Sequence, residues 1–395
     1  MCIDLQSSPI SLVYRLLSAR NHRSQPFLSR IMKLANSLAL ALAVCFVVLS
    51  DACLYGDGPA ERQGMIDKAV SFLRKVGQSD DGSFSSKAGP GITGLVVAGL
   101  LSVDVPADDP LVAKSLKFLV GTLHEDGGLY APKSTHANYE TCLAIMALSK
   151  ANQAGKYTEL IKGAERFVKQ QQWDEGEGIL SDDVAYGGAG YGSKSRPDLS
   201  NTAFLIDALR SAGVSEEDEA IQRALVFVSR CQNLESAHNR TEFASKINDG
   251  GFYYTPAAGG DSMAGKDENG GLRSYASMTY AGLKSMVFAG VDREDFRVKA
   301  AKKFLYNNYS VSTNPGMGSS GLYYYQHTMA KALDALGEKE FNTKDGPRDW
   351  KSELLNHLKK AQQENGSWTN TDARWMEGDP NLVTGYVLLT LAYLK

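Results

Sequence analysis

Two kinds of hydrophobic pattern alternate along the chain from about residue 60 to its end. In the first kind, apolar residues such as Ile66, Val70 and Leu73 recur three or four positions apart among polar ones. That spacing is typical of an α-helix with one buried face. The second kind is apolar at nearly every position, as in TCLAIMAL from Thr141, which is typical of a helix with protein on all sides. The pattern therefore predicts amphipathic helices that cover a set of buried helices.

This alternation occurs six times, and no alternating strand pattern of useful length competes with it. The amphipathic helices are predicted at about 60–76, 110–122, 156–172, 216–231, 294–308 and 348–363. Each buried helix begins near a threonine: Thr93, Thr141, Thr202, Thr279, Thr328 or Thr384. Six pairs with polar faces outside and apolar helices inside predict an all-α fold, an (α/α)6 toroid with a central cavity. The longest insertion, at about 232–274, is expected to overhang the central opening.

A short glycine-containing motif marks the corner between the two helices of a pair. QSDDGSF begins at Gln78 and QQENGSW at Gln362, and both read Q-x-x-x-G-x-aromatic. HEDGGLY from His124 and KINDGGF from Lys246 are weaker copies. A glutamine side chain can bond to backbone groups left free at the end of the outer helix, while glycine permits the turn. The motif therefore indicates a structural role.

The Q-x-x-x-G-x-W corners and the six helix pairs resemble the prenyltransferase and squalene-oxidase repeat family. This family includes squalene–hopene and oxidosqualene cyclases and the β subunits of protein prenyltransferases. The resemblance covers roughly residues 60–395. It implies a toroid with an apolar cavity, entered where the inner helices start. If the protein is an enzyme, the resemblance implies terpenoid-cyclase or prenyltransferase chemistry.

The cyclases of this family protonate an alkene or epoxide with an aspartic acid in the motif D-x-D-D-T-A. Aligned on Thr202, this chain keeps the first acid as Asp198 but has Ser200 and Asn201 in the third and fourth positions. The third position carries the transferred proton in the family, and a serine hydroxyl is far too weak an acid for that step. Asp198 stays the one catalytic candidate, and squalene-type cyclisation is not expected. The same residues also fit a helix N-cap.

No cofactor or metal is expected. The prenyltransferase branch holds zinc with an aspartate and a cysteine two residues apart and with a histidine before an inner-helix threonine. His327 precedes Thr328 in this way, but no D-x-C sequence follows the leader described below. Zinc needs at least three converging ligands, so His327 is interpreted as a polar residue that lines the cavity.

The remaining candidates surround the predicted cavity. The ligand-binding residues expected there are Tyr139, Glu140, Ser200, Asn201, Tyr275, Tyr325 and His327. Aromatic rings with a polar tip suit an elongated apolar ligand or a glycan.

Three hypotheses for the function follow: a protein that binds an isoprenoid or similar apolar ligand, a carbohydrate-active hydrolase or lyase, and a non-catalytic interaction scaffold. The second would use rim carboxylates among Glu140, Asp183, Asp198, Asp249, Asp261, Asp372 and Glu377.

Composition and the N-terminus add the cellular context. The 395 residues carry a net charge of −3 without a lysine- or arginine-rich run, which argues against nucleic acid as a partner. Residues 1–31 are interpreted as a non-native or disordered extension and 32–52 as a secretory signal peptide, which leaves 53–395 as one toroid domain without a transmembrane segment. An exported protein, periplasmic or extracellular, is expected. A lipid anchor on Cys53 is the alternative to a free mature N-terminus.

Overall fold

The computed structural model describes residues 58–192 and 195–395. The predicted leader and Cys53 lie outside these residues. Contacts divide the chain after Gly58, and the description below concerns the unit Pro59–Lys395. No helix in the described residues is both long enough and apolar enough to cross a membrane.

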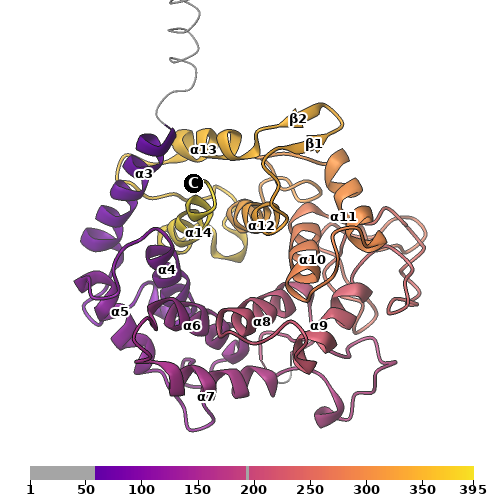
Figure 1. Ribbon diagram of the computed structural model, residues 1–395, viewed down its shortest axis with the longest axis horizontal. Coiled ribbons are helices and arrows are strands. Elements are labelled where there is room, and N and C mark those ends of the chain that lie inside the picture. The colour runs from indigo at the N-terminus through magenta and orange to yellow at the C-terminus, as the bar shows by residue number, and fades with distance from the viewer. Residues whose placement is uncertain (1–57, 193–194) are drawn as a thin grey trace, which may run out of the picture. The chain divides into compact units, whose positions relative to one another are not determined.

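Twelve α-helices of the described residues form two concentric rings (Figure 1). The outer ring contains α3 (Gly58–Phe72), α5 (Pro110–Val120), α7 (Thr158–Lys169), α9 (Glu219–Arg230), α11 (Phe296–Asn307) and α13 (Trp350–Ala361). The inner ring contains α4 (Gly91–Ser102), α6 (Ala137–Ala151), α8 (Leu199–Ser211), α10 (Ala276–Phe288), α12 (Leu322–Ala335) and α14 (Pro380–Ala392). Each inner helix packs against its two neighbours, and α14 contacts α4 to close the ring. The predicted (α/α)6 toroid is therefore confirmed.

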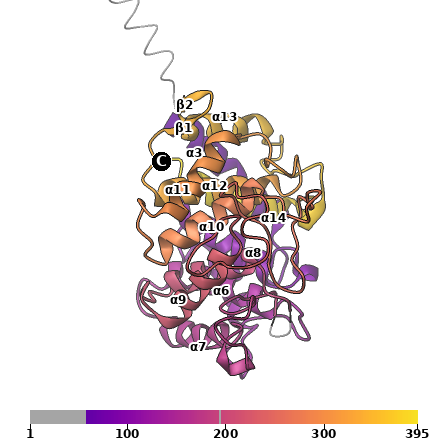
Figure 2. The same ribbon diagram turned by 90° about the vertical axis from the view of Figure 1, so that its right-hand side faces the viewer.

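The connections between the helices differ on the two faces of the ring. Long connections lead from each outer helix to the next inner helix, and they extend from one face of the ring (Figure 2). The other face has short connections, apart from a hairpin of β1 (Phe341–Thr343) and β2 (Gly346–Arg348) between α12 and α13. Short helices interrupt the chain at η1 (Leu73–Gly77), η2 (Ser86–Ala88), η3 (Glu175–Glu177) and η4 (Arg374–Met376). All six inner helices thus begin on the face that carries the long loops, and we call this end of the ring the mouth.

The corner glutamines join neighbouring helix pairs. Gln78 Nε2 donates a hydrogen bond to the backbone oxygen of Leu111 in α5 at 2.8 Å. Gln362 Nε2 donates to the backbone oxygens of Met65 in α3 and of Gly366 in its own corner, both at 3.0 Å. The prediction that these glutamines bond to the free end of the outer helix before them was therefore wrong. The side chain reaches sideways to the next outer helix instead, and so it fixes the spacing of the ring.

Two further glutamines have this role and were missed in the sequence. Gln172 Nε2 donates to the oxygens of Gly187 and Ala220 at 2.8 and 2.9 Å. Gln232 Nε2 donates to the oxygens of Gly250 and Arg297, both at 2.9 Å. Gln232 therefore occupies the place that the weak copy KINDGGF assigned to Lys246, which pairs with Glu242 instead. Insertions separate these glutamines from their glycines and hide the motif.

The recurring threonines fix five of the six inner helices to their corners, and Thr328 in α12 instead donates to the backbone oxygen of Tyr324. The hydroxyl oxygens of Thr93, Thr141 and Thr202 accept hydrogen bonds from backbone nitrogens of their corners at 2.9, 3.0 and 3.0 Å. Thr279 and Thr384 do the same at 3.0 and 3.4 Å. These bonds satisfy buried backbone donors, and they set the height at which each inner helix begins. The first turns of the inner helices are thereby held at one level around the mouth.

Candidate functional site

A cavity of about 600 Å³ lies at the mouth, between the first turns of the inner helices and the corner loops. Eight of its lining side chains are tyrosine, phenylalanine or tryptophan: Tyr139, Tyr191, Phe204, Tyr254, Tyr275, Tyr324, Trp375 and Tyr386. Aliphatic and sulfur-containing residues add to this apolar surface: Ile92, Met263, Met278, Met376 and Leu382. The cavity is thus mainly apolar, with polar groups at the ends of its tyrosine rings.

Four of these aromatic side chains come from four different inner helices and contact one another across the centre of the toroid. The ring centroids of Tyr139 and Phe204 lie 5.2 Å apart, those of Phe204 and Tyr324 6.2 Å apart, and those of Tyr324 and Tyr386 6.0 Å apart. Asp207, one turn further along α8 than Phe204, does not line the cavity. These four side chains therefore close the cavity from below, and we call them the aromatic floor.

The lining contains four of the predicted ligand-binding residues, Tyr139, Glu140, Ser200 and Tyr275. It does not contain Asn201, Tyr325 or His327. Tyr325 is fully buried, and its hydroxyl donates a hydrogen bond to the backbone oxygen of Ser310. Its neighbour Tyr324 lines the cavity instead and accepts a hydrogen bond from Ser200 Oγ at 3.1 Å. One residue along a helix rotates the side chain by about 100°, which explains the exchange.

Asp198 is the N-cap of α8. Its carboxylate accepts hydrogen bonds from the backbone nitrogen of Asn201 at 2.9 Å and from the Asn201 side-chain amide at 2.8 Å. The residue is 2% exposed and does not line the cavity. Burial raises the pKa of Asp198 to about 6, although hydrogen bonds from Asn201 and Tyr254 act to lower it. With this raised pKa, Asp198 is a weak acid. The hydrogen bond that it accepts from the Asn201 nitrogen makes it a helix cap.

Two glutamates line the cavity and are themselves buried. Glu140 is 3% exposed, and its Oε2 accepts a hydrogen bond from the backbone nitrogen of Ala131 at 2.9 Å. Glu377 is 1% exposed and accepts from the backbone nitrogen of Tyr324 at 2.8 Å and from Asn370 Nδ2 at 2.7 Å. Burial raises the pKa of both carboxyl groups. Both therefore hold the mouth together and face its interior.

The other predicted rim carboxylates do not line the cavity. Each is engaged by another group of the loops. Asp183 accepts from the backbone nitrogen of Ala185, Asp249 from Ser274 Oγ, and Asp372 from the backbone nitrogen of Arg374, while Asp261 pairs with Arg196. The carboxylates that face the cavity are therefore Glu140 and Glu377.

The squalene-hopene cyclase C-terminal domain family matches residues 55–255. This chain belongs to that family. The match agrees with the sequence resemblance and with the closed ring of helix pairs. A comparison with curated proteins found no match.

Solved structures share the fold of this squalene-hopene cyclase family member. The apo type II terpene cyclase MstE from Scytonema is 13% identical, with a TM-score of 0.50 over 84% of this chain and 98% of that chain. A sugar epimerase from a ruminal bacterium is 12% identical, with a TM-score of 0.51 over the same shares. A family 88 glycosyl hydrolase from Bacteroides vulgatus is 10% identical, with a TM-score of 0.51 over 84% and 98%. Likenesses at these identities concern the fold alone.

A buried charged cluster lies below the aromatic floor of this family member. Asp207 Oδ2 lies 2.6 Å from Lys284 Nζ and 2.8 Å from Lys331 Nζ, which bring together α8, α10 and α12. Burial alone would raise the pKa of Asp207, but the two lysines outweigh it and hold that pKa below its usual value. His327 lies beside this cluster, where burial and Lys331 lower its pKa to about 3. No sequence pattern indicated this cluster, and His327 lies beside it rather than in the cavity lining.

His327 has no metal partners in the part of the chain that the structure describes. No group of three or more histidine, cysteine, aspartate or glutamate residues there is arranged to hold a metal ion. The Nδ1 atom of His327 has no hydrogen-bond partner among these residues, and its ring lies 6.0 Å from that of Tyr386. The neutral imidazole therefore packs beneath the floor.

The loop before α14 covers one side of the mouth. Trp375 and Met376 line the cavity, remain 43% and 45% exposed, and have positive φ angles of 52° and 64°. Two consecutive non-glycine residues in this conformation are strained. The Trp375 ring packs against Gly321, the N-cap of α12, where an added Cβ would lie 3.1 Å from the ring. The Arg374 guanidinium lies over the Trp375 ring, with its central carbon 4.3 Å from the ring centroid.

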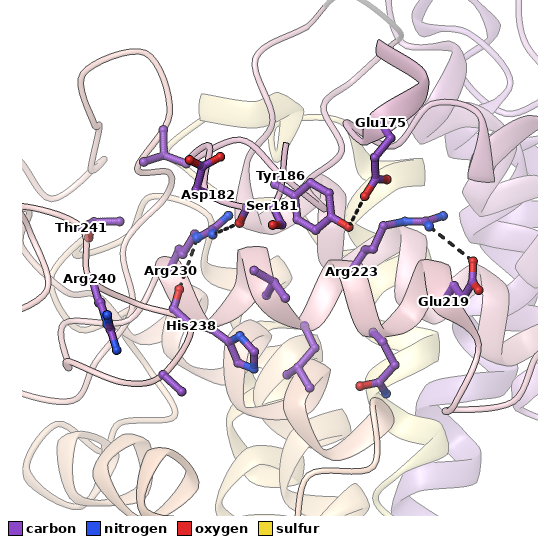
Figure 3. A pocket seen from close by; sticks show the side chains of 15 residues that line it. Glu175, Ser181, Asp182, Tyr186, Glu219, Arg223, Arg230, His238, Arg240 and Thr241 are labelled. Atoms are coloured by element: carbon purple, nitrogen blue, oxygen red, sulfur yellow. Dashed lines mark hydrogen bonds and ion pairs between the residues drawn. The ribbon is translucent and has the colours of Figure 1, made fainter. Parts of the chain in front are cut away.

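A second pocket, of about 1020 Å³, lies outside the ring along α9 (Figure 3). Its charged side chains largely bind one another or the nearby backbone. Arg230 donates to the backbone oxygen of Asp183 at 2.6 Å, Tyr186 donates to Glu175 at 2.9 Å, and Arg223 pairs with Glu219 at 3.6 Å. This surface joins the inserted loops to the outer ring and is separate from the cavity.

Proposed function

We propose that this protein binds an elongated apolar ligand of the isoprenoid type in the mouth cavity, without proton-initiated cyclisation. The observation that carries the proposal is the aromatic floor beneath a mainly apolar cavity of about 600 Å³. Cavities that bury a small organic ligand usually measure roughly 300–1,000 Å³ and place a few polar groups among apolar ones. The third hypothesis, a scaffold without a ligand, leaves this cavity unexplained.

The state of the acid supports binding without protonation. Asp198 lies behind the lining, has a pKa of about 6 and uses both carboxylate oxygens to cap α8. Protonation of an alkene requires a much stronger acid in contact with the substrate. Ser200, at the position of the family's proton donor, instead binds the Tyr324 hydroxyl. Squalene incubated with the purified protein should be recovered unchanged. Cyclised products that disappear in Asp198→Asn would contradict this part of the proposal.

Ligand binding is tested by titrating the protein with farnesol and following tryptophan fluorescence. Trp375 lines the cavity, whereas Trp350 and Trp368 are fully buried elsewhere and Trp173, which donates to the Ser195 backbone oxygen, is not part of the lining. We expect saturable quenching in the wild type and at least about tenfold weaker binding in Tyr386→Ala, which loses one ring of the floor. The matched control is Tyr306→Ala, an exposed tyrosine of α11. Equal affinities for the two variants, or no saturable change in the wild type, would overturn the proposal.

Carbohydrate chemistry is the second candidate. It is favoured by Glu140 and Glu377, two buried carboxyl groups that line one cavity and have raised pKa values. A pair of carboxyl groups is what glycoside hydrolysis needs. Mixed plant and bacterial oligosaccharides are incubated with the protein, and released reducing ends are measured. Release that is lost in Glu377→Gln would favour this candidate, and no release in the wild type would exclude hydrolysis of these substrates.

We also infer that the protein is exported. The support is the sequence at 32–52, with Lys33 before an apolar run and small residues before the expected cut. N-terminal sequencing of the protein secreted by a host cell should begin at Cys53. A cytosolic product that retains residues 32–52 would contradict export, and a Cys53 that carries acyl chains in mass spectrometry would establish the lipid anchor.

A further inference from the structure

We propose that the mouth cavity selects a ligand with a positively charged head, such as an alkylated ammonium group, on its apolar body. This inference rests on the proposed function, because it assumes that the cavity holds an apolar ligand. It adds the chemical class of the polar end.

The first support is a set of buried carboxyl groups at the mouth without cationic partners. Glu140, Asp198 and Glu377 are 3%, 2% and 1% exposed. None of the ion pairs among the described residues includes any of the three. Buried charges in proteins are normally paired because desolvation is costly. A cationic group in the cavity would supply a partner for Glu140 and Glu377, the two that line it.

The hydrogen bonds to these carboxylates come from neutral groups. Glu140 accepts from the backbone nitrogen of Ala131, and Glu377 accepts from the backbone nitrogen of Tyr324 and from the Asn370 amide. These neutral donors and the N-terminal ends of the inner helices favour the charged form of the carboxyl groups, but burial is the larger effect and raises the pKa of Glu140 and Glu377. A cation bound in the cavity would favour the charged form of both groups.

The cationic side chains near the mouth lie at its rim. Lys87 and Lys133 line the opening and are exposed to solvent. The exposed His136 also lines the opening and acts electrostatically on Glu140. Arg196, whose charge acts on Asp198, is paired with Asp261 at 3.1 Å. Exposed charges are screened by water and salt, whereas buried carboxylates are screened much less. The rim therefore does not supply the missing partners inside the cavity.

The second support is the aromatic lining. Eight aromatic side chains line the cavity, and the face of an aromatic ring is negative. One of these rings, Trp375, already has a cation over it, the Arg374 guanidinium at 4.3 Å from the ring centroid. A cation over such a face is attracted by the ring quadrupole, and aromatic cages with alkylated ammonium ligands are the common use of this effect. Carboxylates next to aromatic faces favour an organic cation over a neutral group, and they repel an anion. The described residues contain no cluster suited to a metal ion, which leaves an organic cation as the class that fits.

The test compares three ligands of similar length by isothermal titration calorimetry with the full chain, below their micellar concentrations. Octyltrimethylammonium is the cation, octanol the neutral ligand and octanoate the anion. We expect octyltrimethylammonium to bind about tenfold more tightly than octanol, and octanoate to bind most weakly. Octanol that binds as tightly as the ammonium compound would overturn the inference and leave the proposed function standing. Failure of all three to bind would overturn both.

Two variants connect the preference to the residues named above. Glu377→Gln keeps an oxygen that can accept from the Tyr324 nitrogen but removes the charge, so it should reduce the preference for ammonium over octanol by at least about threefold. Trp375→Leu removes an exposed aromatic face and should reduce the same preference without disturbing the core. The matched control is Glu175→Gln, in the separate pocket along α9. An unchanged preference in a folded Trp375→Leu and Glu377→Gln, checked by circular dichroism, would contradict the inference.

Discussion

Asn201 donates two hydrogen bonds to the Asp198 carboxylate, from its backbone nitrogen at 2.9 Å and from its side-chain amide at 2.8 Å. Asp198 and Asn201 occupy the first and fourth positions of the cyclase motif D-x-D-D-T-A, both of which are acids in that motif. Here the fourth residue is an amide that donates to the first, so the two residues form a closed unit at the start of α8. The arrangement stabilises a helix end, and it places Asp198 behind the cavity lining.

Asp198 should make folding depend on pH in a specific direction. Its pKa in the folded state is raised to about 6, above the ordinary value of 3.8. The folded state therefore holds the proton more tightly, and this contribution to stability is full below about pH 4 and is lost as the pH rises to about 6. The size is of the order of 3 kcal/mol. Urea unfolding of wild type and Asp198→Asn between pH 4 and 7 should show this component in the wild type alone.

Asp295, the N-cap of α11, provides a control with the opposite sign. Hydrogen bonds from Arg297 lower the pKa of Asp295, so its contribution to stability is present above pH 4 and is lost as the pH falls. The stability difference between wild type and Asp295→Asn should therefore grow as the pH rises, while that for Asp198→Asn shrinks. Parallel curves for the two variants would contradict the assignment of Asp198.

Replacement of a corner glutamine should destabilise the ring. Gln232 is 1% exposed and joins Gly250 to Arg297 of the next outer helix. Gln232→Leu removes two hydrogen bonds and leaves backbone oxygens without donors, so we expect a loss of about 2–3 kcal/mol in the free energy of unfolding. Gln63→Leu, at an exposed position of α3, should cost less than about 0.5 kcal/mol. Equal losses in urea unfolding would contradict the role of the corner.

The charged cluster below the floor should respond differently to single and combined changes. Asp207→Leu leaves Lys284 and Lys331 buried without their shared partner, and we expect a loss of about 3–5 kcal/mol in unfolding free energy. The triple variant Asp207→Leu, Lys284→Met, Lys331→Met removes all three charges and should recover most of that loss. Thermal unfolding measures both. A triple variant less stable than Asp207→Leu alone would show that the lysines have another favourable role.

The predictable part of the fold follows from local patterns. Helical periodicity places the six pairs, and the threonines mark the inner helix starts because five of them, all except Thr328, bond a corner nitrogen. The predicted range 110–122, for example, contains α5 at Pro110–Val120. The corners of Gln172 and Gln232 escape sequence reasoning because long insertions separate each glutamine from its glycine. A motif search requires fixed spacing, whereas the fold requires only that the two ends meet.

The candidate site is less predictable because it depends on helix rotation and on distant partners. Tyr325 and Tyr324 differ by one position, yet only Tyr324 lines the cavity. The rotation of α12 is set by packing on α10 and α14, which no local pattern reveals. The contact of Asp207 with Lys284 joins residues of two helices with the longest insertion between them. Contacts of this kind form only when the inner helices are assembled side by side, so the sequence alone does not reveal them.

The aromatic floor should set the length of the ligand. Phe204→Ala removes the ring between Tyr139 and Tyr324 and deepens the cavity. We expect this variant to bind geranylgeraniol more tightly relative to farnesol than the wild type does, with a loss of about 3 kcal/mol in unfolding free energy. The control is Phe304→Ala in outer helix α11, which should lose stability but keep the wild-type length preference. The same shift in both variants would argue against a floor at Phe204.

Photoaffinity labelling with a diazirine-bearing farnesyl analogue, followed by peptide mapping, tests the central claim most directly. The account predicts that the label attaches to peptides of the aromatic floor, from α6, α8, α12 or α14, and that free farnesol prevents it. Label along α9, in the pocket of Figure 3, or label that farnesol does not displace, would contradict a ligand site in the mouth cavity.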